Sequence, residues 1–118
     1  DLSLGMLEQS RKLAAAKWLA NIGMASAVNG ALPFPDGGFD LVTCRIAPHH
    51  FPSIARFLTE VRRVLKPGGT FALVDNVAPD AETTPGFPRE ALVAAGAAYN
   101  AFEKLRDPSH GRALDTAE

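Results

Sequence analysis

The stretch IARFLTEVRRVLKPGGTFALVDNV, residues 54–77, decides the fold. Its first half has apolar side chains at positions i, i+3, i+4, i+7 and i+11, which is the spacing of one buried helical stripe. These side chains are Ile54, Phe57, Leu58, Val61 and Leu65. The KPGG segment at 66–69 then ends the helix, because proline cannot continue a helix and glycine turns freely. Residues 70–77 follow as a predicted strand with an apolar, buried centre.

A second strand is predicted on the other side of this helix. Residues 39–46 form a nearly continuous apolar run, which indicates burial on both faces of a sheet. Two prolines and a glycine pair in the preceding residues, 32–38, predict a turn region. A strand, a helix and a second strand joined by short connections predict a right-handed parallel pair and an α/β fold.

The remaining segments give weaker patterns. Ser3 can cap a helix that runs to about Leu19. Residues 22–28 are short and weakly apolar and are predicted to form a strand. Residues 89–106 are predicted to form a helix whose packing side carries the large apolar residues. These residues are Leu92, Tyr99, Phe102 and Leu105.

Composition excludes several function classes. The net charge is -1 and no block of like charges occurs, so we expect no nucleic-acid partner. One cysteine cannot form an internal disulfide, and no Cys/His cluster has the spacing of a metal site. No apolar run approaches the roughly 18–20 residues of a membrane span. At 118 residues the chain is one domain at most, and a cytoplasmic setting is expected.

Four stretches together resemble the type 11 methyltransferases, the group that includes the ubiquinone and menaquinone C-methyltransferases. They are DLSLGML at 1–7, ALPFPDGGFD at 31–40, HHF at 49–51 and VRRVLKPGG at 61–69. Their order and spacing carry the resemblance. It implies a partial Rossmann-like class I methyltransferase sheet, with S-adenosylmethionine as the cofactor and a small-molecule methyl acceptor as the partner.

The resemblance also implies how much of such a domain the chain supplies. Residues 1–118 correspond to a partial methyltransferase domain, with a core match over 1–78 and a loop and helix extension over 79–118. In the family a glycine-rich cofactor motif precedes the position of Asp1, and the chain is expected to lack it. Of the sheet order 3-2-1-4-5-7-6, the chain supplies strands three, four and five, with 22–28 as the third.

The family's adenosine-binding positions map onto five residues. Asp1 matches the acidic residue that accepts hydrogen bonds from the ribose hydroxyls, although it also suits a helix start. Leu2 would lie against the adenine edge, and Met6 would close an apolar slot beside it. The family usually has an acidic residue where this chain has Val28. Adenine recognition would then use backbone groups or Asn29.

Arg45 ends the strand predicted over 39–46, and its role has two readings. It could face the methionine carboxylate of the cofactor or a substrate anion. It could equally form an ion pair with Asp40 or Asp75. Cys44, the preceding residue, is predicted to be a small core residue rather than a nucleophile, because methyl transfer needs no covalent intermediate.

His49 and His50 follow the same strand, at the sheet edge where open α/β sheets bind ligands. Either could act as the general base, since histidine titrates near neutral pH. The alternative is that one packs under the next helix and the other is solvated. Asp75 and Asn76 end the following strand at the same edge and could orient a ligand or cap a loop.

The predicted function is S-adenosylmethionine-dependent methyl transfer to a small molecule. The reaction is an in-line displacement, so positioning is the main task of the protein. An alternative is a non-catalytic remnant or interaction module that keeps the scaffold. A nicotinamide-dependent dehydrogenase would need a G-x-G-x-x-G turn, which the sequence does not contain. The charged side chains of the 54–65 helix and its end are predicted to be its solvated face: Glu60, Arg62, Arg63 and Lys66.

Overall fold

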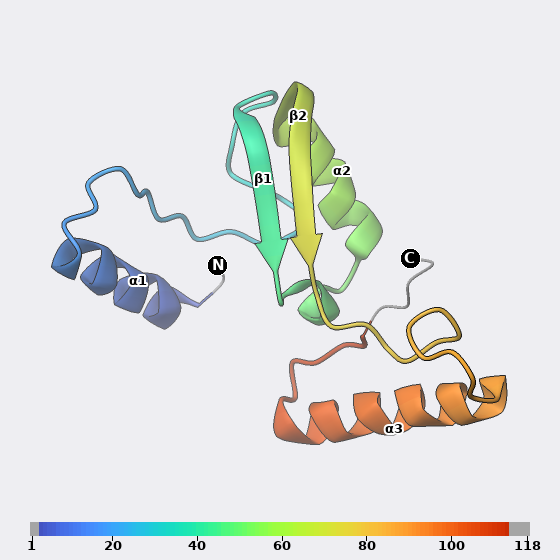
Figure 1. The fold of residues 1–118 in the computed structure, drawn as a ribbon. Coiled ribbons are helices and arrows are strands. Elements are labelled where there is room, and N and C mark those ends of the chain that lie inside the picture. The colour runs from blue at the N-terminus through green and yellow to red at the C-terminus, as the bar shows by residue number, and fades with distance from the viewer. Residues whose placement is uncertain (1–2, 114–118) are drawn as a thin grey trace. The chain divides into compact units, whose positions relative to one another are not determined.

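A computed structural model describes residues 3–113, which form three α-helices, one short 3-10 helix and a two-stranded sheet (Figure 1). In chain order the elements are α1 (Leu4–Ala16), β1 (Phe39–Arg45), η1 (Pro48–His50), α2 (Ile54–Val64), β2 (Leu65–Val74) and α3 (Arg89–Arg106). The chain divides into two compact units. Among the described residues, the first unit comprises those up to 40 and 55–69, and the second comprises 41–54 and those from 70 onward.

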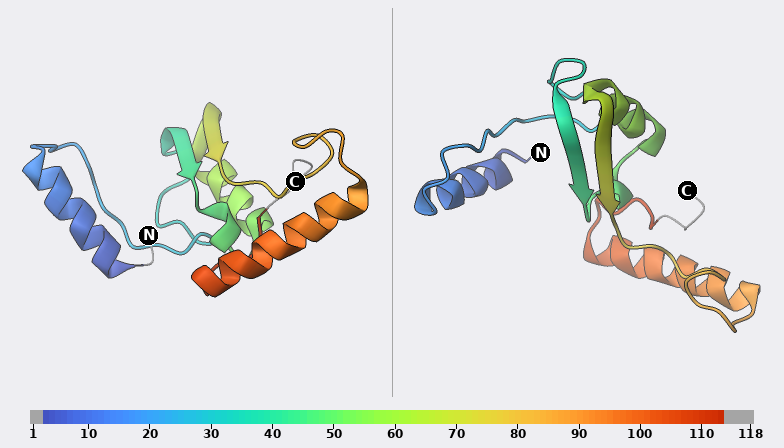
Figure 2. Two further views of the ribbon diagram at one scale, coloured as in Figure 1. Left: turned by 60° about the horizontal axis from the view of Figure 1, so that its bottom comes forward. Right: turned by 45° about the horizontal axis from the view of Figure 1, so that its top comes forward.

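β1 and β2 are hydrogen-bonded neighbours and run in the same direction, with α2 as the connection between them (Figure 1). The predicted α/β class and the parallel pair are therefore confirmed. α2 and the start of β2 lie side by side in Figure 1 and in both views of Figure 2. Phe57 and Val61 of the predicted stripe are buried, and so is Val64, which lies outside it, while Leu58 is 39% exposed.

β2 begins five residues earlier than predicted, at Leu65, and ends at Val74 rather than at Val77. The KPGG segment therefore lies inside the strand and not in a separate turn. Gly69 allows this close start, because a Cβ there would lie 3.0 Å from the Lys66 carbonyl oxygen and 3.2 Å from the Asp40 carbonyl oxygen. A larger residue would push the beginning of β2 away from β1.

The prediction that β1 is buried on both faces is wrong for the described residues. None of the seven residues of β1 is buried, and Leu41 remains 54% exposed. In β2, Leu73 is 43% exposed. A parallel strand becomes buried on both faces only where a layer covers each face. The exposure of these leucines shows that the described segments cover their side chains only in part.

α1 begins as predicted, since the Ser3 hydroxyl accepts a hydrogen bond from the Met6 amide at 3.3 Å. The helix ends at Ala16 instead of continuing to Leu19. Trp18 explains the early end, because its backbone adopts a left-handed φ of 55° that a right-handed helix cannot contain.

The predicted strand over residues 22–28 is absent from the described structure. Only an isolated antiparallel bridge joins Val28 to Ala31, with the Ala31 amide donating to the Val28 carbonyl at 3.1 Å. A strand needs a neighbour for its backbone groups. Within residues 3–113 the sheet consists of β1 and β2, so this segment has no strand beside it.

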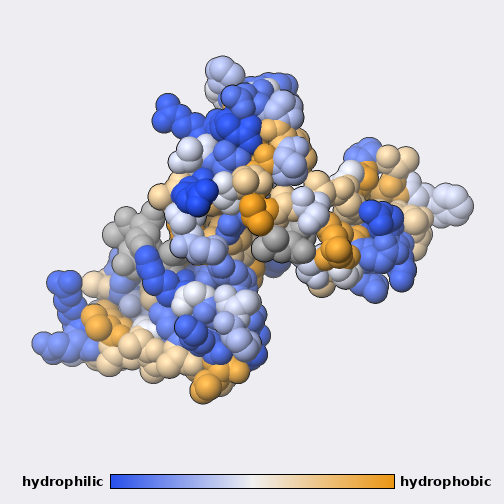
Figure 3. Space-filling view, turned by 180° about the vertical axis from the view of Figure 1, so that it is seen from behind, coloured by the Kyte–Doolittle hydropathy of each residue, from blue (hydrophilic) through white to orange (hydrophobic). Residues whose placement is uncertain are grey.

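α3 has the predicted bounds, and its predicted packing side is confirmed at Leu92 but not toward its C-terminal end. Leu92 and Gly96 are its buried residues. Phe102 and Leu105, expected on the packing side, are 62% and 86% exposed. Figure 3 shows apolar residues on the surface over α3, at the bottom of that view. No helix among residues 3–113 is long and apolar enough to cross a membrane.

Arg63 holds the loop that precedes β1, all within the first unit. Its guanidinium donates to the carbonyl oxygens of Leu32 and Phe34 at 2.9 and 2.8 Å. It also donates to the Asp36 carboxylate at 2.7 Å and to Glu60 at 2.8 Å. Glu60 in turn accepts the Leu32 amide at 2.7 Å. Glu60 and Arg63 were predicted to face solvent, and for this pair the prediction is wrong.

The hydrogen bonds from the Arg63 side chain and the Leu32 amide lower the pKa of Glu60 to about 2 from its ordinary value of 4.5. Protonation of Glu60 below about pH 2 neutralises the carboxylate that accepts hydrogen bonds from the Arg63 guanidinium and the Leu32 amide. A group with a lowered folded-state pKa stabilises the fold above its unfolded pKa and loses this contribution as the pH falls.

We therefore expect Glu60→Gln to have a lower free energy of unfolding than wild type at pH 6. The difference between the two proteins should shrink as the pH falls from about 4.5 to about 2. Chemical denaturation at several pH values measures this difference. Glu82→Gln, at an exposed position, is the control. A wild-type advantage that stays constant down to pH 2 would contradict the assignment.

Candidate functional site

The carboxyl ends of the two strands bring His49 and Asp75 together in the second unit. η1 follows β1 and carries His49, while Asp75 follows β2 directly. The Asp75 carboxylate accepts the His49 backbone amide at 3.0 Å through Oδ2 and contacts the ring Nδ1 at 2.7 Å through Oδ1. The two side chains are only 9% and 4% exposed. Both carboxylate oxygens are thus used to fix one histidine.

This contact determines which ring nitrogen of His49 carries the proton. An ionised carboxylate only accepts hydrogen bonds, so Nδ1 must be the donor. In the neutral imidazole, Nε2 then keeps its lone pair. A buried carboxylate that orients an imidazole in this way also stabilises the cation formed when Nε2 takes a proton. The pair is therefore equipped for general base chemistry.

His50 is oriented by the segment after α3. Its Nδ1 lies 3.1 Å from the Ser109 hydroxyl, which donates to Asp107 Oδ1 at 2.7 Å. Because the hydroxyl proton points to Asp107, the hydroxyl oxygen accepts from His50 Nδ1–H, while His50 Nε2 lies 4.0 Å from Asp107 Oδ2. The Ser109 hydroxyl and amide lower the pKa of Asp107. The His50 side chain is 32% exposed, more than that of His49.

A third histidine, His110, completes the cluster. The ring centroids of His49 and His50 are 4.1 Å apart, and that of His110 lies 5.3 Å from His49 and 6.4 Å from His50. His110 is buried, and Asn100 holds its Nε2 at 2.9 Å. All three histidines of the sequence therefore meet in one place. Sequence reasoning assigned no role to His110, although a histidine shortly after the final helix was the available signal.

The described members of the predicted adenosine-binding set, Met6, Val28 and Asn29, belong to the first unit. Asp1 and Leu2 lie outside the described residues. Met6 is 58% exposed on α1 and Val28 is 46% exposed, while Asn29 is half-buried. These apolar side chains are free to pack against a flat ring, and the amide of Asn29 can accept a hydrogen bond from an amine. An adenine-binding role for Met6, Val28 and Asn29 stays a prediction from the family resemblance.

Arg45 lies at the exposed end of β1. Both acidic residues considered as its ion-pair partners are engaged elsewhere. Asp40 binds the Lys66 ammonium group at 2.8 Å, and Asp75 binds His49. These contacts favour the reading in which Arg45 faces an anion.

Cys44 lies half-buried in β1. Burial raises the pKa of its thiol, and the negative charge of Asp75 raises it further. A thiol is a poor nucleophile when its pKa is raised. Among the described residues no group of three or more His, Cys, Asp or Glu side chains could hold a metal ion.

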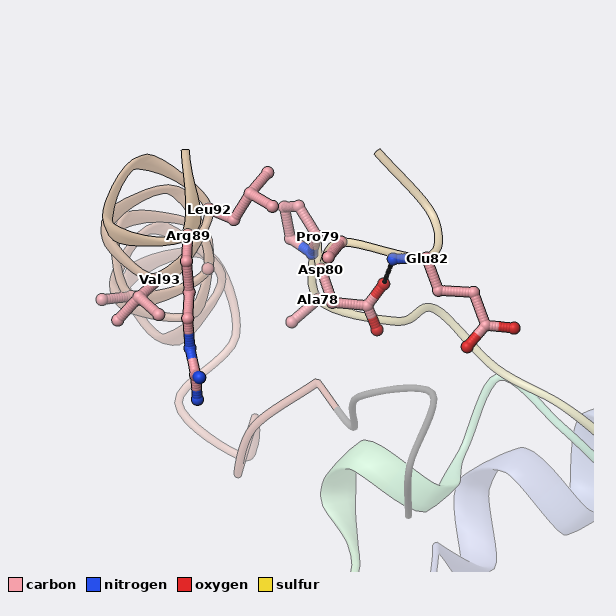
Figure 4. A pocket seen from close by; sticks show the side chains of 10 residues that line it. Ala78, Pro79, Asp80, Glu82, Arg89, Leu92 and Val93 are labelled. Atoms are coloured by element: carbon pink, nitrogen blue, oxygen red, sulfur yellow. Dashed lines mark hydrogen bonds between the residues drawn. The ribbon is translucent and has the colours of Figure 1, made fainter. Parts of the chain in front are cut away.

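A cavity of about 580 Å³ lies between the loop at 78–82 and α3 (Figure 4). Leu92 points from α3 toward Pro79 on the loop, and Arg89 and Val93 come from the same helix. On the loop side, the Asp80 carboxylate accepts the Glu82 amide at 3.0 Å. The size is typical of small-molecule sites, which combine apolar walls with a few polar groups.

Comparisons with known proteins identify the family of the chain. The methyltransferase domain family matches residues 1–73. YcgJ of Bacillus subtilis, whose name describes an uncharacterized methyltransferase, is 36% identical over 118 residues, covering 100% of this chain and 42% of YcgJ. The solved YcgJ structure superposes with a TM-score of 0.84 at 35% identity, over 99% of this chain and 45% of that chain.

Two further proteins extend the comparison. A demethylmenaquinone methyltransferase of Symbiobacterium thermophilum is 45% identical over 78 residues, covering 64% of this chain and 30% of that protein. A structure of a SAM-dependent methyltransferase from Aquifex aeolicus has a TM-score of 0.63 at 19% identity, over 91% of this chain and 55% of that chain, and shows the shared Rossmann-like fold. This chain spans about half or less of the length of these relatives. It belongs to the type 11 methyltransferase domain family.

Proposed function

We propose that the intact protein transfers the methyl group of S-adenosylmethionine to a small-molecule acceptor, and that His49 takes the proton that the acceptor loses. The observation that carries the proposal is the buried contact of 2.7 Å between His49 Nδ1 and Asp75. It lies at the carboxyl ends of parallel strands, where open α/β sheets bind ligands. Family membership supports methyl transfer as the reaction.

The cofactor residues are proposed from the family resemblance. Asp1 would accept hydrogen bonds from the ribose hydroxyls, and Leu2 would lie against the adenine edge. Met6 and Val28 would provide apolar contact for the ring, which fits their exposure of 58% and 46%. Asn29 would accept a hydrogen bond from the adenine amine.

Arg45 would bind the methionine carboxylate, because a guanidinium matches a carboxylate with two parallel hydrogen bonds. S-adenosylmethionine supplies, when bound, an electrophilic methyl carbon. The work left to this chain is to orient the acceptor, to exclude water and to accept a proton. His50 is the second candidate for that last task, since it lies beside His49 and its side chain is more exposed.

We propose that the apolar part of the acceptor occupies the cavity between the 78–82 loop and α3 while its nucleophile extends out of the cavity toward His49, because neither His49 nor His50 lines the cavity. Its volume of about 580 Å³ and its apolar walls suit a small, largely apolar molecule that has a carbon or oxygen nucleophile. Arg89 adds a positive charge for a polar or anionic substituent. The relative that is named a demethylmenaquinone methyltransferase makes a quinol-like ring the first acceptor class to assay. We propose the cytoplasm as the location, as the composition predicts.

The cavity assignment predicts the kinetics of a variant on its wall. Val93 lines the cavity and is 64% exposed, so Val93→Asp places a charge in the cavity at little cost to folding. We expect the KM for the acceptor to rise about tenfold while kcat changes little, as for a loss of uniform binding. Leu105→Asp, on the same helix at 86% exposure and outside the cavity lining, is the matched control. Equal KM values for the two variants would overturn the assignment.

The reaction itself is tested with S-adenosylmethionine labelled at the methyl group. The intact protein is incubated with quinols, phenols and other small apolar acceptors, and label is measured in the extracted small molecules. Transfer to one acceptor class, abolished in a His49→Gln variant, supports the proposal. A folded protein that transfers no label and binds no cofactor would instead be the non-catalytic remnant or interaction module.

A further inference from the structure

We propose that Asn100 is a positioning residue for His49 and His50, and that it acts through the segment 107–113. The proposal rests on the function assigned above to the two histidines. Asn100 lies on α3, near its C-terminal end, and contacts neither of their rings in the hydrogen bonds described. Asn100 acts on the two histidines through the backbone and side chains of residues 107–113, which follow α3.

The orientation of the Asn100 amide is determined by its partners. Its Oδ1 lies 2.7 Å from the Ala113 backbone nitrogen and 2.9 Å from His110 Nε2. A backbone amide can only donate, so the atom facing it is the oxygen. His110 Nε2 must then donate as well, because the same oxygen accepts both. Both partners are buried, at 4% exposure each, so one side chain anchors the segment at two points.

Between these anchors the segment contacts His49. The Gly111 amide donates to the His49 carbonyl oxygen at 2.8 Å. A Cβ on Gly111 would lie 2.7 Å from that oxygen, a distance that real Cβ atoms essentially never show. The close approach thus requires glycine at position 111. The hydrogen bond from Gly111 fixes the backbone of His49, and Asp75 fixes its ring.

The first half of the segment contacts His50. The Asp107 carboxylate accepts the Ser109 amide and hydroxyl at 2.9 and 2.7 Å, which fixes the hydroxyl beside His50 Nδ1. The His110 amide donates to the Asp107 carbonyl at 2.9 Å and closes this turn. The turn is therefore continuous with the residues that Asn100 anchors. Loss of the anchor is expected to loosen the contacts with both histidines.

The test compares two substitutions of nearly equal size. Asn100→Leu removes both hydrogen bonds, whereas Asn100→Asp keeps an oxygen that accepts them. We expect Asn100→Leu to lower kcat by about ten- to a hundredfold, since small misplacements of reacting groups have effects of this order. The KM for S-adenosylmethionine should change little. Asn100→Asp should recover most of kcat. Asn21→Leu makes the same change at an exposed position and serves as the control.

A second readout does not depend on activity. Nuclear magnetic resonance of the imidazole nitrogens reports the hydrogen bond between His49 Nδ1–H and Asp75 directly. We expect Asn100→Leu to shift and broaden this signal, and Asn100→Asp to restore it. Ala113→Pro removes one of the two donors to Asn100 and leaves Asn100 in place, so we expect an intermediate His49 signal. This variant serves as the test if Asn100→Leu does not fold.

Two results would overturn the proposal. One is a folded Asn100→Leu variant with an unchanged His49 signal and an unchanged kcat. The other is an equal loss in Asn100→Leu and Asn100→Asp, which would mean that the amide matters for packing rather than as an acceptor. A wild-type protein that transfers no methyl group would refute the proposed function. The His49 signal would still decide the positioning claim.

Discussion

Replacing His49 with glutamine is expected to lower kcat by about 10²- to 10⁴-fold, the usual contribution of a general base. Glutamine retains an N–H group that can bind Asp75 but has no basic nitrogen near neutral pH. The fold should therefore persist while proton removal fails. The measurement is the rate of label transfer at saturating cofactor, with a thermal melt to confirm that the variant is folded.

Two companion variants separate the roles of the neighbouring residues. Asp75→Asn keeps the shape of the side chain but loses the carboxylate that selects the Nδ1–H tautomer, so we expect a loss of kcat in the same direction. His50→Gln should have a smaller effect than His49→Gln. If His50→Gln abolished transfer while His49→Gln remained active, the base would be His50 and the assignment to His49 would be wrong.

Replacing Gly111 with alanine is expected to reduce the free energy of unfolding by about 1–3 kcal/mol, a typical cost of forcing extra volume into a packed site. The new Cβ would lie 2.7 Å from the His49 carbonyl oxygen, which is backbone and cannot rotate away. The segment must move, and the hydrogen bond from the Gly111 amide at 2.8 Å is lost with it. Urea denaturation of the intact protein measures the change.

Gly23→Ala is the matched control for this prediction. A Cβ at Gly23 would meet no atom within 4 Å, and its backbone is not in the left-handed region. We expect its unfolding midpoint to equal that of wild type or to rise slightly, because alanine restricts the unfolded chain. Equal midpoints for Gly111→Ala and Gly23→Ala would contradict the packing described around His49.

The sequence predicts those parts of the fold that depend on local periodicity. The burial predicted for Phe57 and Val61 and the bounds predicted for α3 agree with the structure because neighbouring turns of one helix determine them. The strand predicted over 22–28 is wrong because a strand depends on a partner that may lie far along the chain. Periodicity within seven residues contains no information about that partner.

The polar half of α2 shows a second limit of pattern reasoning. Charges opposite an apolar stripe normally face water, which is how Glu60 and Arg63 were read. A proline-rich loop earlier in the chain folds onto that face, and the carbonyl oxygens of Leu32 and Phe34, 31 and 29 residues before Arg63, bind the guanidinium. Such an interaction is specified by tertiary structure, and the helical pattern is the same with or without it.

The candidate site was partly predictable. The rule that carboxyl ends of parallel strands share a sheet edge placed His49 and Asp75 at the same edge, although their direct contact was not predicted. Asn100 and His110 join the cluster through the fold of residues that follow α3. No helical or strand pattern marks that segment, so a structure was required to reveal it.

The central claim is that the intact protein binds the cofactor of the methyltransferase family. Calorimetric titration with S-adenosylhomocysteine, the product form of the cofactor, tests it without knowledge of the acceptor. We expect saturable binding at one site per chain, weakened by Asp1→Ala and unchanged by the exposed control Asn21→Leu. A folded, intact protein that releases no heat and shows no shift in melting temperature at millimolar ligand would contradict the claim.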